Sequence, residues 1–164
     1  MAEQKDSGEF VFFYGTLLPE FVPDTMGSVL DRLRFSGEGS VCGMLYDLGE
    51  YPGAVFDATS DKRVYGAVFE LPEDSQVLQA LDRYEGYDPS ARDKSLFVRK
   101  LQHVDLATGG AIECWSYEYN GNPEDAPILA SGRYEGTDWR RKEGANPSTG
   151  SGQALGHSLH DGLN

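Results

Sequence analysis

A single glutamate, Glu85 in the run Asp82–Tyr87 (DRYEGY), is the first candidate for catalytic chemistry in this sequence. A carboxylate among aromatic side chains loses hydration, which raises its pKa toward neutral pH and suits it to general acid/base work. It also follows a predicted helix, whose negative dipole end disfavours a second negative charge. The pattern alone equally fits one of 27 acidic residues solvating a helix end, and for an arbitrary glutamate that interpretation is the commoner one.

A second candidate is the short segment Tyr14, Gly15, Thr16 and Leu17, a glycine turn directly after a strongly apolar run. Glycine has no Cβ, so backbone amides around Gly15 could approach a ligand closely and bind a carboxylate or an oxyanion. The structural alternative is a strand that simply ends at a glycine, and the pattern taken alone favours it.

Other kinds of catalytic site lack the residues they need. His103 lies on a predicted strand, and His157 and His160 lie in a Gly/Ser-rich tail that offers no fixed geometry for a metal. Neither a G-x-S-x-G elbow nor a nucleotide-binding G-x-x-x-x-G-K-[ST] loop occurs. Cys42 and Cys114 have no paired-cysteine spacing and are expected to be reduced thiols. We therefore expect no metal and no cofactor.

Composition and charge restrict the partners. The chain has 164 residues, 39% of them hydrophobic, and a net charge of −13, so a single domain that does not bind nucleic acid is expected. The basic cluster at 138–142 is too short to change that expectation. No apolar stretch reaches the ~20 residues of a membrane span, and the N-terminus lacks a secretory pattern. The sequence thus predicts a cytoplasmic protein without a membrane partner.

Several short β-rich segments surround one helical pattern. The apolar residues Val77, Leu78, Leu81 and Tyr84 have the spacing of one helix face, which predicts a helix over 74–84, capped by Asp74 or Ser75 and ended near Gly86. The predicted strands cover residues 10–14, 41–46, 54–56, 64–71, 96–104 and 111–119.

This pattern favours an α+β fold with a barrel or a strongly curled sheet. In the last strand Trp115, Tyr117 and Tyr119 should share one face, because side chains alternate along a strand. The expected organisation is a flexible N-terminus at 1–9, one domain at 10–140 and a disordered tail at 141–164.

Five motifs in the same order resemble the gamma-glutamyl cyclotransferase-like family, in particular its gamma-glutamylamine cyclotransferase and plant avirulence-induced (AIG2-like) branches. The matching segments are 11–17, 43–48 with 51–53, 81–86, 97–99, and 116–119 with 131–132. The resemblance runs from Phe10 to about Tyr134. It implies a small mixed or antiparallel barrel of about six strands with a flanking helix.

The resemblance also implies a reaction. The family's substrate-binding loop corresponds to Tyr14–Leu17 and its general acid/base to Glu85. The expected activity is cyclisation of a gamma-glutamyl group to 5-oxoproline, with release of the attached amine. Phe97, Arg99 and Tyr117 are further possible pocket residues.

One residue departs from the family pattern. Phe97 stands where many relatives have tyrosine, so a hydroxyl is missing if this position faces the substrate. A non-catalytic small-ligand-binding or signalling module on the same fold is therefore the alternative function. The identity of the leaving amine, and the choice between monomer and dimer, are left open by the sequence.

Overall fold

The structure is a computed structural model that describes residues 9–136. The cluster at 138–142, His157, His160, the tail at 141–164 and all but the last residue of the N-terminal segment 1–9 lie outside this range. All helices and strands described below belong to the compact unit that ends at Tyr134.

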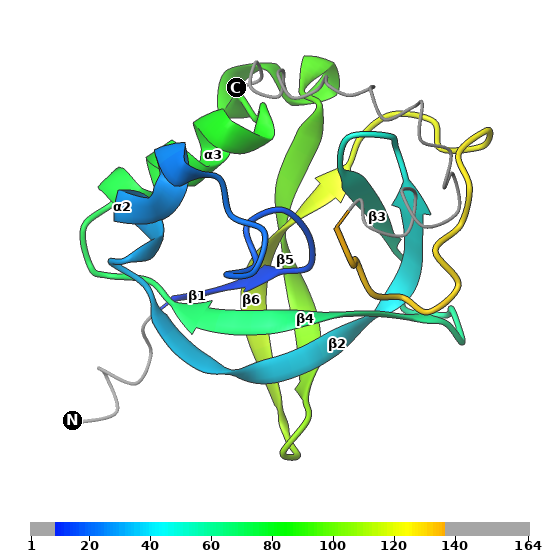
Figure 1. The fold of residues 1–164 in the computed structure, drawn as a ribbon, viewed down its shortest axis with the longest axis horizontal. Coiled ribbons are helices and arrows are strands. Elements are labelled where there is room, and N and C mark those ends of the chain that lie inside the picture. Colours follow the sequence, from blue (N-terminus) through cyan, green and yellow to red (C-terminus); the bar gives the residue numbers. More distant parts are fainter. Residues whose placement is uncertain (1–8, 137–164) are drawn as a thin grey trace, which may run out of the picture. The chain divides into compact units, whose positions relative to one another are not determined.

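Five strands close into a barrel (Figure 1). The ring runs β2-β4-β1-β6-β5 and returns to β2, with β1 and β6 parallel and the other pairs antiparallel. Its members are β1 (Phe10–Phe13), β2 (Arg34–Asp47), β4 (Arg63–Glu70), β5 (Phe97–Leu106) and β6 (Ala111–Tyr119). This confirms the predicted α+β class with a small mixed barrel. The sixth strand, β3 (Pro52–Phe56), lies outside the ring and pairs with the end of β2.

The long strand β2 explains both closure and the extra strand. Its first part, Arg34–Cys42, pairs with β4, and Gly39 and Ser40 also pair with β5. Its second part pairs with β3 through Gly43–Asp47. At the closure point a Cβ on Gly39 would lie 2.8 Å from the Asp105 carbonyl oxygen, so glycine permits the strands to meet there.

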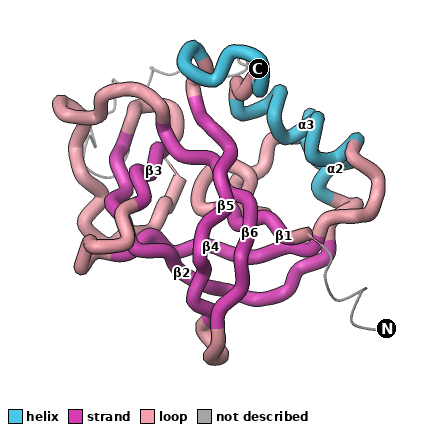
Figure 2. The backbone as a smooth tube through the Cα atoms, turned by 180° about the vertical axis from the view of Figure 1, so that it is seen from behind, coloured by secondary structure: helices cyan, strands magenta, loops and turns pink. Residues whose placement is uncertain are grey.

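The main helix, α3, covers Gln76–Glu85, close to the predicted range. The N-cap residue is Ser75, one of the two expected, but its side chain makes no capping hydrogen bond. The Asp74 carboxylate, one residue earlier, instead accepts a hydrogen bond from the Gln76 amide at 3.0 Å. Gly86 ends the helix in the left-handed conformation, with φ of 73°. Three short elements were not predicted: η1 (Asp24–Met26), α2 (Gly27–Leu30) and η2 (Pro89–Lys94). Figure 2 shows α2 and α3 side by side along one side of the barrel.

Two buried clusters fill the unit, and β1 contributes to both. Phe12 belongs to a cluster to which all five ring strands contribute, and which therefore fills the barrel. Phe13 belongs to the other cluster, which includes Val77 and Leu81 of α3 and so lies between strands and helix. Because both faces of β1 are buried, its sequence is continuously apolar instead of alternating.

The aromatic face predicted for β6 is present. Tyr117 is buried in the cluster beneath α3, and Trp115 and Tyr119 pack against the same cluster. Cys42 and Cys114 are both free thiols, as expected. No helix within residues 9–136 is long and apolar enough to cross a membrane.

Candidate active site

Glu85 is the last residue of α3 and is half-buried. Its carboxyl group makes no hydrogen bond or ion pair with any residue in the range 9–136. Loss of hydration on burial, and then the negative charge of Asp82, raise the pKa of Glu85 from 4.5 to about 8. The side chain is therefore partly withdrawn from water, which disfavours its charged form.

The segment Tyr14–Leu17 follows directly from β1 and turns sharply. The Leu18 amide donates to the Gly15 carbonyl at 2.9 Å. A Cβ on Gly15 would lie only 2.7 Å from Cγ of Pro52, so only glycine fits here without displacement. The backbone amides of Gly15, Thr16 and Leu17 have no hydrogen-bond acceptor in the described part of the chain. Buried amides normally have a partner, so these three are available to a ligand.

The loop and the glutamate are neighbours in space. The Thr16 hydroxyl lies 2.8 Å from the hydroxyl of Tyr84, the residue directly before Glu85. Burial and the charge of Glu85 both raise the pKa of Tyr14. The pKa of Tyr84 is raised to about 12, chiefly by burial, against an opposing effect of the Thr16 hydrogen bond. The two segments that sequence analysis selected separately thus lie next to each other in the fold.

Two side chains of the loop have structural roles. The Tyr14 hydroxyl donates to the Tyr117 carbonyl at 2.7 Å and accepts from the Ala54 amide at 3.1 Å, which links β6 to β3. Leu17 is buried in the cluster beneath α3. A substrate would therefore meet the backbone of these two residues, because their side chains are already engaged in the fold.

Phe97, the departure from the family pattern, is buried between two tyrosine rings. Its ring centroid lies 6.0 Å from that of Tyr51 and 5.7 Å from that of Tyr119. Burial, and then the neighbouring Tyr119, raise the pKa of Tyr51, and Glu85 adds to this effect. Two phenol groups therefore flank Phe97, and one of them, Tyr51, interacts electrostatically with Glu85.

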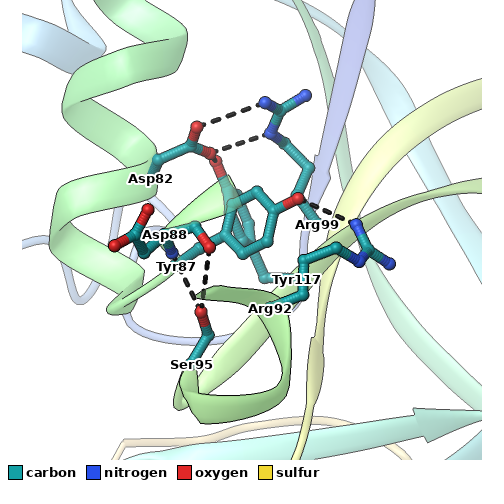
Figure 3. Close-up of polar contacts among 7 residues, drawn as sticks. All are labelled: Asp82, Tyr87, Asp88, Arg92, Ser95, Arg99 and Tyr117. Carbon is teal, nitrogen blue, oxygen red and sulfur yellow. Dashed lines mark hydrogen bonds and ion pairs between the residues drawn. The ribbon is translucent and has the colours of Figure 1, made fainter. Parts of the chain in front are cut away.

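Arg99 and Tyr117, the other possible pocket residues, bind a carboxylate of the protein itself (Figure 3). That carboxylate belongs to Asp82, which sequence analysis did not select. Arg99 donates to both of its oxygens, at 2.8 and 3.2 Å, and Tyr117 donates at 2.6 Å. One signal could have identified it: Asp82 lies four residues after Leu78, so an acid falls on the apolar face of the helix.

The segment after α3 is also well anchored (Figure 3). Arg92 donates to the Tyr87 hydroxyl at 2.9 Å, and the Asp88 amide donates to the Ser95 hydroxyl at 2.9 Å.

Within residues 9–136 no group of three or more His, Cys, Asp or Glu side chains could hold a metal ion. The absence of a cofactor remains a prediction.

Comparison with known proteins identifies the family to which the chain belongs. A sequence profile for the family described as gamma-glutamyl cyclotransferase, AIG2-like, matches residues 11–141. No curated protein matches the chain significantly.

Several solved structures resemble the fold, among them the following three. YkqA from Bacillus subtilis is 18% identical with a TM-score of 0.59, over 85% of this chain and 44% of that one, so the chain spans less than half of YkqA. An AIG2-like protein from Mus musculus is 23% identical with a TM-score of 0.62, over 78% of this chain and 88% of that one. A structure named gamma-glutamyl cyclotransferase is 16% identical with a TM-score of 0.51, over 74% and 69%. At these identities the likeness establishes the fold.

Proposed function

Because the chain belongs to the gamma-glutamyl cyclotransferase, AIG2-like family, we propose that it cyclises a gamma-glutamyl group to 5-oxoproline and releases the attached amine or amino acid. One observation carries the proposal. The half-buried carboxyl of Glu85, without a partner in the range 9–136, lies beside a loop whose amides of Gly15, Thr16 and Leu17 also lack one. An acid/base group and a set of oxyanion donors are what this reaction requires.

The substrate supplies its own nucleophile. Its α-amine attacks the γ-carbonyl carbon, a new C–N bond closes the five-membered ring, and the C–N bond to the leaving amine breaks. Since the attack is intramolecular, correct orientation replaces an external nucleophile and a covalent enzyme intermediate. This agrees with a site in which one carboxyl group is the main titratable residue.

Glu85 would transfer the proton. The substrate ammonium must lose a proton before it can attack, and the leaving nitrogen must gain one before it departs. A carboxyl group with a pKa of about 8 can accept the first proton and return it near neutral pH. An exposed glutamate of ordinary pKa would be a much weaker base for this step.

The loop after β1 would stabilise the oxyanion that forms on the γ-carbonyl oxygen. Its amides are rigid backbone donors, so they need no reorganisation when charge develops. The Thr16–Tyr84 hydrogen bond holds this loop against the helix end that carries Glu85. Donors and base therefore approach one substrate from two different elements.

The experiment measures 5-oxoproline from gamma-glutamyl dipeptides, gamma-glutamyl-ε-lysine and glutathione. We expect at least one to be converted, and Glu85→Gln to reduce kcat by about 10²- to 10⁴-fold with the fold intact. Glu73→Gln, the same change at an exposed glutamate before α3, is the matched control and should retain full activity. Conversion of none of these compounds, or full activity in Glu85→Gln, would refute the mechanism. Binding of a gamma-glutamyl compound without turnover would instead favour the non-catalytic module.

A further inference from the structure

A second carboxylate lies one helical turn before Glu85. Asp82 and Glu85 are three residues apart on α3 and are therefore neighbours on its surface. We propose that Asp82 is a positioning residue for Glu85: held in place by Arg99 and Tyr117, it sets the proton affinity of the catalytic carboxyl and fixes the helix end that carries it. This inference rests on the function proposed above for Glu85 and deepens it.

The position of Asp82 is determined by three elements of the fold. Only 10% of its side chain is exposed, and its oxygens accept two hydrogen bonds from Arg99 of β5 and one from Tyr117 of β6. The Arg99 guanidinium is in turn stacked on Trp115, with its carbon 4.5 Å from the ring centroid, and lies 5.5 Å from the ring of Tyr87. Helix and barrel are thus joined at this residue (Figure 3).

The surroundings of Glu85 make the Asp82 charge effective. The titratable groups that interact electrostatically with Glu85 come from α3, from the loop after β1, from the β2–β3 loop and from β6: Asp82, Tyr84, Tyr14, Tyr51 and Tyr117. A tyrosine is neutral or negative, never positive. Two arginines of this region are both engaged: Arg99 by Asp82, and Arg92 by the Tyr87 hydroxyl. The negative charge of Asp82 therefore disfavours a second negative charge on Glu85.

The two carboxyl groups thus have different tasks. Asp82 has its oxygens occupied by charged and neutral donors, whereas Glu85 has none in the described part of the chain. Such a division, one carboxylate bound and one left to exchange a proton, assigns acid/base work to the second. A buried ion pair stabilises a fold no more than apolar side chains of similar volume would. The position of the Asp82–Arg99 pair beside the candidate base therefore suggests a function for it other than stability.

The test is a carboxyl ¹³C NMR titration of Glu85 in the full chain without substrate, with the signal assigned by its loss in Glu85→Gln. We compare wild type, Asp82→Asn and Asp93→Asn, the last being the same change at an exposed position of η2. Asp82→Asn should lower the titration midpoint of Glu85 by about 1 pH unit, while Asp93→Asn should leave it unchanged. An unchanged or raised midpoint in Asp82→Asn overturns the proposal.

Two further measurements complete the test. Asp82→Asn leaves Arg99 without its carboxylate, so Asp82→Asn/Arg99→Gln serves if the single variant does not fold. The double variant should also lower the Glu85 titration midpoint, by less than the single variant does. If the midpoint does not fall, the proposal is overturned. If wild type is active, the acid limb of its kcat/KM pH profile should shift together with the Glu85 midpoint in each folded variant. An acid limb that does not shift contradicts the positioning role of Asp82. If wild type forms no 5-oxoproline, the proposed function fails, while the titration still tests Asp82.

Discussion

The hydroxyl groups of Thr16 and Tyr84 lie 2.8 Å apart, although the two residues are separated by 68 positions in the chain. This contact joins the loop with available amides to the helix end that carries Glu85. A single hydrogen bond contributes about 1 kcal/mol to stability, so its main importance is geometric. It brings together the loop amides and the Glu85 carboxyl group, to which the proposed function assigns oxyanion binding and proton transfer.

Removal of that contact should affect activity more than stability. Tyr84→Phe keeps the ring but loses the hydroxyl, so the loop is no longer tied to α3. We expect the free energy of unfolding to fall by about 1 kcal/mol and kcat/KM for 5-oxoproline formation to fall about tenfold or more. Urea denaturation and the turnover assay measure the two effects. Tyr65→Phe, whose hydroxyl makes no hydrogen bond within residues 9–136, is the control.

Gly15 should tolerate no side chain unless Pro52 is also changed. In Gly15→Ala the new Cβ would lie 2.7 Å from Cγ of Pro52, and the loop must move. We expect a loss of about 1–3 kcal/mol in stability together with most of the turnover. Pro52→Ala removes the atom that clashes, so Gly15→Ala/Pro52→Ala should recover part of both. Gly27→Ala, where a Cβ meets nothing within 4 Å, should be neutral. A fully active Gly15→Ala would contradict the role given to this loop.

Ionisation of Glu85 should make the protein less stable as the pH rises. The folded pKa is about 8 and the ordinary value is 4.5, so between these two pH values the folded state binds more protons than the unfolded state. Stability from this group is therefore complete below pH 4.5 and is lost as the pH rises through 8.

Glu85→Gln removes the titration. It should be more stable than wild type by about 1–2 kcal/mol at pH 9, a value reduced for partial exposure, and nearly equal to it at pH 4. Chemical denaturation of both proteins across this range measures the difference. Parallel pH profiles for wild type and Glu85→Gln would show that Glu85 titrates with its ordinary pKa.

The Tyr14 hydroxyl should matter for the fold. In Tyr14→Phe the buried amide of Ala54 and the carbonyl of Tyr117 lose a partner. We expect a loss of about 2–3 kcal/mol in the free energy of unfolding, since unsatisfied buried polar groups are costly. At a temperature where the variant is fully folded, kcat should change little. A large fall in kcat without a stability change would instead place the hydroxyl on the substrate.

Much of the fold follows from local pattern. The continuous apolar run of β1, the helical spacing of α3 and the glycine at its end depend on residues close together in the chain, and each was predicted near its observed place. Glu85 and the Tyr14–Leu17 segment were also singled out from the sequence alone, by residue type, glycine position and resemblance, and their part in catalysis stays a prediction.

Tertiary structure decided how these parts are used. Pairing between strands that are distant in the chain decides that five strands close the ring and that β3 stays outside it. That Tyr14 uses its hydroxyl for the fold depends on a partner 103 positions away. Asp82 was missed because its importance comes from Arg99 and Tyr117, which are 17 and 35 positions further along the chain. Local patterns indicate the periods of helices and strands and the points where these elements end. The partner of a buried charge, in contrast, is set only when separate elements pack together.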